Sequence, residues 1–317
     1  MQVSESRRGA MKYLSSGLLG AGVAACGGSQ AENTSKPAFV LVHGAWHNSS
    51  TYTEVIAFLA QLGHAAVAVD LPGHGLRARL PRSWRQRPFN APAFAMEPSP
   101  VANVTLNDYA NHVVEAIDRM RGLGNEKVVL VGHSLGGATI TQVGEIASGK
   151  LSKLVYLTAF LPFNGKTLLE TSLAPEGALN EVPGLMIGDA VATGANRIDP
   201  DSPDPVYQAK LKSAFYADVA EDVSVAMGNL LTPDEPVAPA VTPITRSASK
   251  WGAVPRHYIK CLQDRAVVPA LAQKMIDTAD AEFPQHKTIV HSMNTSHSPF
   301  LSQPEALARL LATIAMS

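Results

Sequence analysis

Residues 128–139, VVLVGHSLGGAT, place one serine between glycines at the point where an apolar run ends. The run 128–131 has the length and composition of a buried strand, and residues 135–147 have helical spacing. Ser134 therefore lies at a sharp strand-to-helix turn of the form Gly-x-Ser-x-Gly, where side chains at the flanking glycine positions would collide. The turn lifts the hydroxyl to a helix N-terminus, where backbone N–H groups favour developing negative charge. This stretch predicts a nucleophilic serine.

Strand and helix patterns alternate on both sides of this turn. Apolar runs of strand length cover residues 38–42, 65–69, 127–131, 153–158, 256–262 and 287–290. Helical spacing covers residues 53–62, 106–120, 135–147, 269–279 and 304–315. The strands are apolar on both faces, which is typical of a parallel sheet covered by helices on each side. The sequence therefore predicts an α/β fold with a mostly parallel sheet.

The alternation fails between residues 162 and 253, where Pro and Gly are frequent and no buried strand is evident. One helical stretch, residues 206–231, stands out there. An insertion at the carboxyl ends of parallel strands lies over the ligand crevice. We expect residues 37–161 and 254–317 to form one core, and residues 162–253 to form a mainly helical cap over it.

A second departure covers residues 76–100, which join a strand to a helix where a short loop would serve. This segment holds five arginines, five prolines, Trp84 and two phenylalanines. One interpretation is a flap or an anion-attracting entrance to the crevice. A solvated insertion is the favoured interpretation.

The first 36 residues are expected to form an export signal and a polar tether. Arg7 and Arg8 precede a short run rich in Leu, Ala and Gly, as in a secretory signal, and their setting resembles a twin-arginine signal. Residues 23–27, VAACG, resemble a lipoprotein cleavage site, so a lipidated Cys26 that tethers the protein to a membrane is an alternative to an ordinary signal. The expected location is exported and periplasmic.

Composition limits the remaining classes of protein. With 46% hydrophobic and 17% charged residues, the chain can bury a sizeable core. A formal net charge of −1 gives no reason to expect a nucleic-acid partner. Two cysteines, Cys26 and Cys261, provide neither a disulfide framework nor a metal cluster.

A nucleophilic serine needs a base, and the base needs an acid that orients it. The histidines late in the chain are His257, His286, His291 and His297. His297 lies in a polar loop after the last strand pattern, from which an imidazole can reach the sheet edge. Asp264 directly follows the strand pattern 256–262, at the same edge as Ser134. We predict Ser134, Asp264 and His297 to be the catalytic triad.

An oxyanion hole requires two N–H donors. The amide of Leu135, directly after the nucleophile, is one candidate, and the amide of Ala45 in the loop after the first strand is the other. The primary candidates for the substrate pocket are Trp46, His133, Phe160 and Trp251. Further cap candidates are Phe163, Met186, Phe215 and Met227. This chemistry requires no metal and no organic cofactor.

Five motifs, in this order, resemble those of the α/β-hydrolase superfamily. They are HGAW at 43–46, DLPGHG at 70–75, GHSLGG at 132–137, DR at 264–265 and SHSPFL at 296–301. They are similar to the branch that contains plant methylesterases, hydroxynitrile lyases and bacterial esterase relatives. The resemblance covers the sheet core, about residues 37–160 and 254–317, whereas the cap matches only in position and length. The segment 76–100 falls outside the pattern.

The resemblance implies a serine hydrolase that cleaves carboxylic esters through an acyl-enzyme. The lyases of this branch carry a glutamate before the nucleophile and a lysine after the catalytic histidine, where this chain has His133 and Ser298. We therefore expect a serine esterase that acts on small to medium hydrophobic or aromatic ester substrates. A lyase like the hydroxynitrile lyases and a receptor-like, ligand-binding hydrolase fold are the alternatives.

Overall fold

The computed structural model describes residues 36–317. The predicted export signal, the tether up to residue 35 and Cys26 lie outside the described residues. Within the described part of the chain, no helix combines the length and apolar character needed to cross a bilayer.

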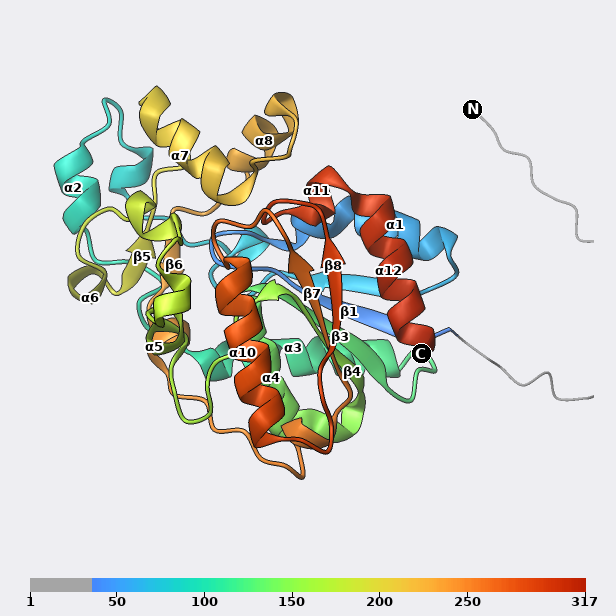
Figure 1. Cartoon of the computed structure of the whole chain (residues 1–317). Coiled ribbons are helices and arrows are strands. Elements are labelled where there is room, and N and C mark those ends of the chain that lie inside the picture. Colours follow the sequence, from blue (N-terminus) through green and yellow to red (C-terminus); the bar gives the residue numbers. More distant parts are fainter. Residues whose placement is uncertain (1–35) are drawn as a thin grey trace, which may run out of the picture. The chain divides into compact units, whose positions relative to one another are not determined.

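A six-stranded sheet organises the molecule, with the strand order β2-β1-β3-β4-β7-β8 (Figure 1). Every neighbouring pair in it is parallel, which confirms the predicted sheet. The strands are β1 (Ala38–Val42), β2 (Ala66–Val69), β3 (Val128–Ser134), β4 (Leu151–Ala159), β7 (Arg256–Cys261) and β8 (Ile289–Met293). The carboxyl ends of parallel strands share one edge, so residues that follow β3 and β7 meet there.

Helices cover both faces of the sheet because alternate strand residues point to opposite sides. Val40 and Leu130 belong to the core on one face, and their neighbours Leu41 and Val131 belong to the core on the other. The first face packs on α3 (Leu106–Arg121), α4 (Gly136–Ala147) and α10 (Pro269–Glu282). The second packs on α1 (Thr53–Gln61), α11 (Pro299–Ser302) and α12 (Pro304–Met316). This double coverage explains the continuous apolar runs in the sequence.

The last strand differs most from its predicted position. The apolar pattern predicted residues 287–290, but β8 begins at Ile289 and ends at Met293. As an edge strand of the described sheet, β8 pairs with β7 on one side only, and Ile289 is 53% exposed. Hydrophobicity therefore marks the limits of this strand poorly.

The segment between β4 and β7 adds no strand to the main sheet. It holds α5 (Leu168–Ser172), α6 (Ala190–Thr193), α7 (Pro205–Phe215), α8 (Glu221–Gly228), α9 (Ala238–Val241) and the antiparallel pair β5 (Ala195–Arg197) and β6 (Asp234–Pro236). The helix expected over residues 206–231 is two helices, because the chain leaves the helix at Tyr216. The buried phenol of Tyr216 donates to His47 in the core over 2.8 Å.

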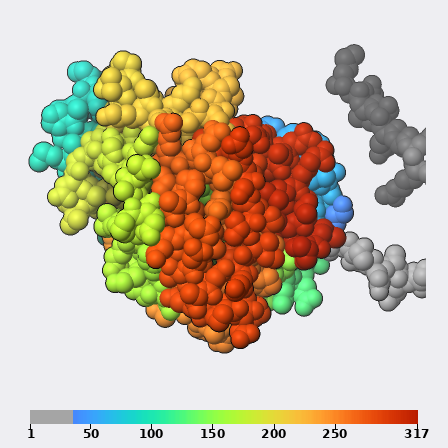
Figure 2. Space-filling model, viewed as in Figure 1, coloured from blue at the N-terminus to red at the C-terminus, as the bar shows by residue number. Residues whose placement is uncertain are grey.

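Most of residues 76–100 are exposed, in line with the favoured interpretation of a solvated insertion, but part of the segment packs on the cap. They contain the short helix α2 (Ala91–Met96), and Phe94 in it is 1% exposed. The Arg197 guanidinium lies 4.8 Å from the centre of the Phe94 ring and donates to the Phe94 carbonyl. Figures 1 and 2 show α2 beside the cap. The aromatic rings of Trp84, Phe89 and Phe94 pack on one another, which the arginine-rich composition gave no reason to expect.

Candidate active site

Ser134 is the last residue of β3, and its backbone is in the left-handed region with φ +52°. This conformation is uncommon outside glycine and marks a sharp turn. The flanking glycines are needed for space. A Cβ on Gly132 would lie 2.7 Å from the Gly136 carbonyl oxygen, and a Cβ on Gly136 would lie 2.6 Å from the His43 carbonyl oxygen. The chain therefore presents the Ser134 hydroxyl at the N-terminus of α4.

Asp264 and His297 lie together beneath the surface at the same sheet edge. His297 Nδ1 donates to Asp264 Oδ2 over 2.7 Å, and the two residues are 1% and 3% exposed. The backbone N–H groups of Ala266 and Val267 donate to the other oxygen, Oδ1, over 2.7 and 3.0 Å. This arrangement holds the carboxylate as an acceptor, so that the proton of the neutral imidazole resides on Nδ1 and Nε2 is free to act as a base.

The loop that carries His297 is bound to the residue before the nucleophile. His133 Nε2 donates to the His297 carbonyl over 2.9 Å, and the two rings lie 4.4 Å apart between centres. Within residues 36–317, no hydrogen bond joins Ser134 to the His297 ring. In unliganded sites such bonds are often long and shorten when substrate binds.

The two candidate oxyanion donors border the same space as the nucleophile. Ala45, Leu135 and Ser134 all line one cavity. The loop that carries Ala45 lies directly on the turn, since a Cβ on Gly44 would come within 2.6 Å of Ser134 Cβ. Leu135 is the N-cap residue of α4. The arrangement presents a hydroxyl, two backbone segments and a buried Asp–His pair at one edge of the sheet.

The cavity has a volume of about 540 Å³ and is mostly apolar. Trp46 and Phe160, two primary candidates for the substrate pocket, line this cavity, as do the cap candidates Met186 and Phe215. Its remaining walls come largely from residues 168–183 of the cap. Glu235 is the one charged residue among the described residues that line it.

Two primary candidates for the pocket are corrected by the structure. Trp251 is fully buried at a distance from the cavity, where its indole N–H donates to Tyr156 over 2.9 Å. His133 is also fully buried and supports the His297 loop instead of contacting the cavity. Of the other cap candidates, Phe163 and Met227 lie outside the lining. Phe163 and Met227 pack in hydrophobic clusters instead.

Buried histidines around the site are held in the neutral state. Burial lowers the pKa of His47 from 6.5 to about 4. The imidazole of His47 donates from Nδ1 to the Ala45 carbonyl over 2.8 Å and accepts from Tyr216 at Nε2. Burial also holds the pKa values of His43 and His133 well below 6.5. Within residues 36–317, no three His, Cys, Asp or Glu side chains gather as a metal-binding group.

Two polar residues of the site were missed by the sequence reasoning. Thr158 Oγ1 donates to Asp264 Oδ2, and Thr158 has a left-handed backbone with φ +37°. A polar residue at the carboxyl end of the strand beside the serine strand is a signal that could have identified it. Glu235 in the cap is buried against the loop of Ala45, and no local pattern distinguishes it.

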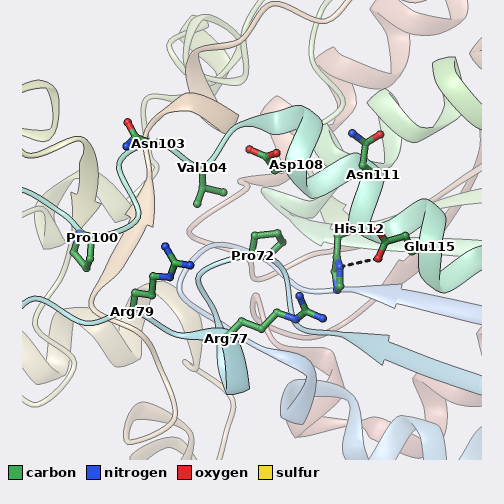
Figure 3. Close-up of a pocket in the computed structure, with 10 residues that line it drawn as sticks. All are labelled: Pro72, Arg77, Arg79, Pro100, Asn103, Val104, Asp108, Asn111, His112 and Glu115. Carbon is green, nitrogen blue, oxygen red and sulfur yellow. Dashed lines mark ion pairs between the residues drawn. The ribbon is translucent and has the colours of Figure 1, made fainter.

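Arg77 and Arg79 of the insertion line a different, surface pocket of about 450 Å³. Figure 3 shows them across from Asp108 and from the His112–Glu115 pair, in which Nδ1 and Oε2 lie 3.6 Å apart. No residue of the segment 76–100 lines the Ser134 cavity. The interpretation of this segment as a flap or entrance to the crevice therefore gains no support.

Comparisons with known proteins place this architecture in a family. A family model described as "Alpha/beta hydrolase family" matches residues 39–310. Methylesterase 4 of Arabidopsis thaliana is 28% identical over 293 residues, which cover 90% of this chain and 98% of that protein. A pyrethroid hydrolase of Sphingobium wenxiniae is 28% identical over 287 residues, or 87% of this chain and 86% of the relative. The chain spans only 63% of the length of a longer relative, the putative chloroplastic methylesterase 11 of Arabidopsis thaliana.

A crystal structure of a pyrethroid hydrolase matches with a TM-score of 0.70 at 25% identity, covering 89% of this chain and 98% of that chain. The strand order, the nucleophile turn and the family match point to the same conclusion. The chain belongs to the alpha/beta hydrolase family.

Proposed function

We propose that this protein is a serine esterase that uses Ser134, His297 and Asp264. The observation that carries the proposal is the buried 2.7 Å hydrogen bond from His297 to Asp264, beside a serine held at a strained turn. Relatives named as methylesterases and as a pyrethroid hydrolase also support ester hydrolysis.

In the proposed mechanism, Ser134 Oγ attacks the ester carbonyl carbon while its proton passes to His297 Nε2. The carbonyl oxygen becomes an oxyanion that accepts hydrogen bonds from the Ala45 and Leu135 amides. The ester C–O bond then breaks, and His297 returns the proton to the departing alcohol oxygen. Water attacks the acyl-enzyme with His297 as base, and the acid product leaves as Ser134 regains its proton. Asp264 stabilises the imidazolium that forms twice in this cycle.

The cavity favours neutral, hydrophobic esters. Its walls are mostly apolar, so a charged substrate group would lose hydration there without gaining a partner. A volume of about 540 Å³ suits small to medium esters. A lyase reaction has weaker support, because His133 and Ser298 are both fully buried and neither lines the cavity.

The nucleophile is tested with Ser134→Ala on a panel of aryl and alkyl esters of graded acyl length. We expect kcat/KM to fall by roughly 10⁴-fold or more, since a triad without its nucleophile keeps only a small residual activity. Ser148→Ala is the matched control, because Ser148 caps the far end of the same helix. An undiminished rate in Ser134→Ala would reject the mechanism.

A fluorophosphonate probe separates an enzyme from a receptor-like hydrolase fold. A serine esterase is labelled at Ser134 and is then inactive. If the wild-type protein binds esters but neither turns them over nor is labelled, the receptor-like alternative is correct.

A further inference from the structure

Glu235 is a buried carboxylate in the cap whose polar contacts are all to the core. It lies in β6 and is 1% exposed. Its Oε2 accepts from the backbone N–H of Trp46 over 3.1 Å and lies 2.9 Å from His74 Nε2. Its Oε1 accepts from the Tyr109 hydroxyl over 2.9 Å. One cap side chain thus joins the loop after β1, the loop after β2 and helix α3.

Trp46, the residue bound by Glu235, has an unusual backbone. Its φ is +62°, a conformation that is an outlier for a bulky residue and persists only where the surroundings fix it. Every polar group of Trp46 is bound to the cap. Its N–H donates to Glu235 and its indole N–H donates to the Asn196 carbonyl over 2.9 Å. Its carbonyl accepts from the backbone N–H and the hydroxyl of Thr232, over 2.9 and 3.1 Å.

These contacts act on the residue that directly follows a candidate oxyanion donor. Ala45 directly precedes Trp46, and the loop leaves no spare room at the nucleophile, as the Gly44 contact with Ser134 demonstrates. If Trp46 relaxed to a negative φ, the chain on one side of it would have to rotate. His47, buried and bonded to the Ala45 carbonyl, restricts the chain after Trp46, so the Ala45 side would move.

The same carboxylate is coupled to the other end of this loop through two histidines. His74, beside Glu235, packs its ring 5.1 Å from that of His43. His43 Nε2 accepts from the Leu71 N–H over 3.1 Å, so the ring proton is on Nδ1 and is donated to the Gly44 carbonyl over 2.8 Å. The loop 43–47 is therefore supported on both sides of Ala45, and Glu235 is common to both supports.

We infer that Glu235 is a positioning residue that holds the Ala45 amide in the oxyanion hole, so that this one side chain of the cap affects the rate of the reaction. This inference rests on the proposed esterase function. The alternative is that Glu235 only ties the cap to the core. The two interpretations predict different kinetic changes. An oxyanion contact is formed with the transition state and hardly with the bound ester, so a positioning role changes kcat more than KM.

The test compares Glu235→Ala and Glu235→Gln in the full-length protein. We expect Glu235→Ala to lower kcat by about 10- to 100-fold, with KM changed by less than about threefold, since loss of a whole oxyanion donor costs about 10²- to 10³-fold. Glu235→Gln keeps an oxygen acceptor for the Trp46 N–H and is expected to regain most of the lost rate. A trifluoromethyl ketone, which forms an oxyanion on Ser134, should bind Glu235→Ala more weakly by a similar factor.

Asp234→Asn is the matched control. Asp234 is the neighbouring buried carboxylate in β6, and it pairs with Arg197 over 2.6 and 2.8 Å without contacting the loop 43–47. Its loss should lower the Tm and leave the kcat of the folded protein unchanged. If Glu235→Ala does not fold, Thr232→Val removes one bond to the Trp46 carbonyl, and a fall of about two- to fivefold in kcat with constant KM is expected.

The inference is overturned if the Glu235 variants lose thermal stability but keep both wild-type kcat and wild-type affinity for the trifluoromethyl ketone. Where Thr232→Val replaces the Glu235 variants, an unchanged kcat likewise overturns the inference. Failure of the proposed function is recognised separately: wild-type protein and Ser134→Ala would then hydrolyse esters equally, whatever residue occupies position 235.

Discussion

At the scale of single residues, Asp264 is the most heavily bonded group of the site. Its two oxygens accept from His297, Thr158, Ala266 and Val267. The backbone donors fix Oδ1, so that Oδ2 faces both the imidazole and the threonine hydroxyl. Charge-assisted hydrogen bonds of this kind are stronger than neutral ones and orient the acceptor. The position of the His297 ring therefore depends on Thr158 as well as on Asp264.

Thr158→Val tests this dependence, because valine keeps the shape and the branched Cβ but lacks the donor. We expect kcat/KM to fall by about tenfold, the equivalent of one bond to a charged group. Thr158→Ser keeps the donor and should retain most of the activity. Thr139→Val is the control, since within the described chain the buried hydroxyl of Thr139 has no partner. Wild-type kcat/KM in Thr158→Val would mean that the backbone donors alone orient Asp264.

At the scale of elements, helix α4 links the nucleophile to the packing below the sheet. It begins two residues after the serine, and Gly144 in its second half packs on Trp251. The guanidinium groups of Arg246 and Arg256 lie 4.6 and 4.1 Å from the centre of the Trp251 indole ring, and the indole N–H donates to Tyr156. Because these contacts fix Trp251, α4 needs a residue without a side chain where it faces the indole, at Gly144.

Gly144→Ala in α4 tests this packing. Alanine is favoured over glycine in a helix by about 1 kcal/mol. The added Cβ, however, would lie 2.7 Å from Trp251 Cδ1 and 3.2 Å from Leu154 Cδ1. We expect the clash to prevail, with a net loss of roughly 1–3 kcal/mol in the free energy of unfolding, measured by urea denaturation. Gly149→Ala, where nothing lies within 4 Å of the new Cβ, should be neutral or slightly stabilising. Equal stability of the two variants would contradict the close packing.

At the scale of the whole molecule, burial of neutral histidines makes stability depend on pH. Burial lowers the pKa values of His47 and His257 from 6.5 to about 4. The folded protein keeps these rings neutral while the unfolded chain takes up protons as the pH falls below 6.5. The stabilisation that comes from keeping these rings neutral is complete above about pH 6.5 and is lost as the pH falls toward 4. For each ring, the free energy of unfolding falls by at most about 1.4 kcal/mol per pH unit.

Thermal unfolding should therefore show a Tm that falls steadily from pH 6.5 to pH 4.5. His257, which lies outside the site and pairs with His291 over 3.1 Å, gives the cleaner variant. His257→Gln should reduce the slope, whereas the exposed His286, changed to Gln, should leave it unaltered. A Tm that stays constant over this range would show that the rings are protonated within the fold.

The sequence by itself determined the parallel sheet, the turn at Ser134 and the edge at which Asp264 and His297 follow their strands. Those features depend on local periodicity and on glycine spacing, which a single stretch of chain carries. Export of the protein stays a prediction from the sequence, as does lipidation of Cys26.

Only the tertiary structure decided which side chains meet. It moved His133 and Trp251 from the pocket into the packing, joined residues 76–100 to the cap, and brought Glu235 to the loop of Ala45. Residues 46 and 235 are distant in the chain, and their pairing depends on how the cap folds back over the sheet. No local pattern encodes such a contact, because burial and charge pairing between remote segments are set by the packed whole.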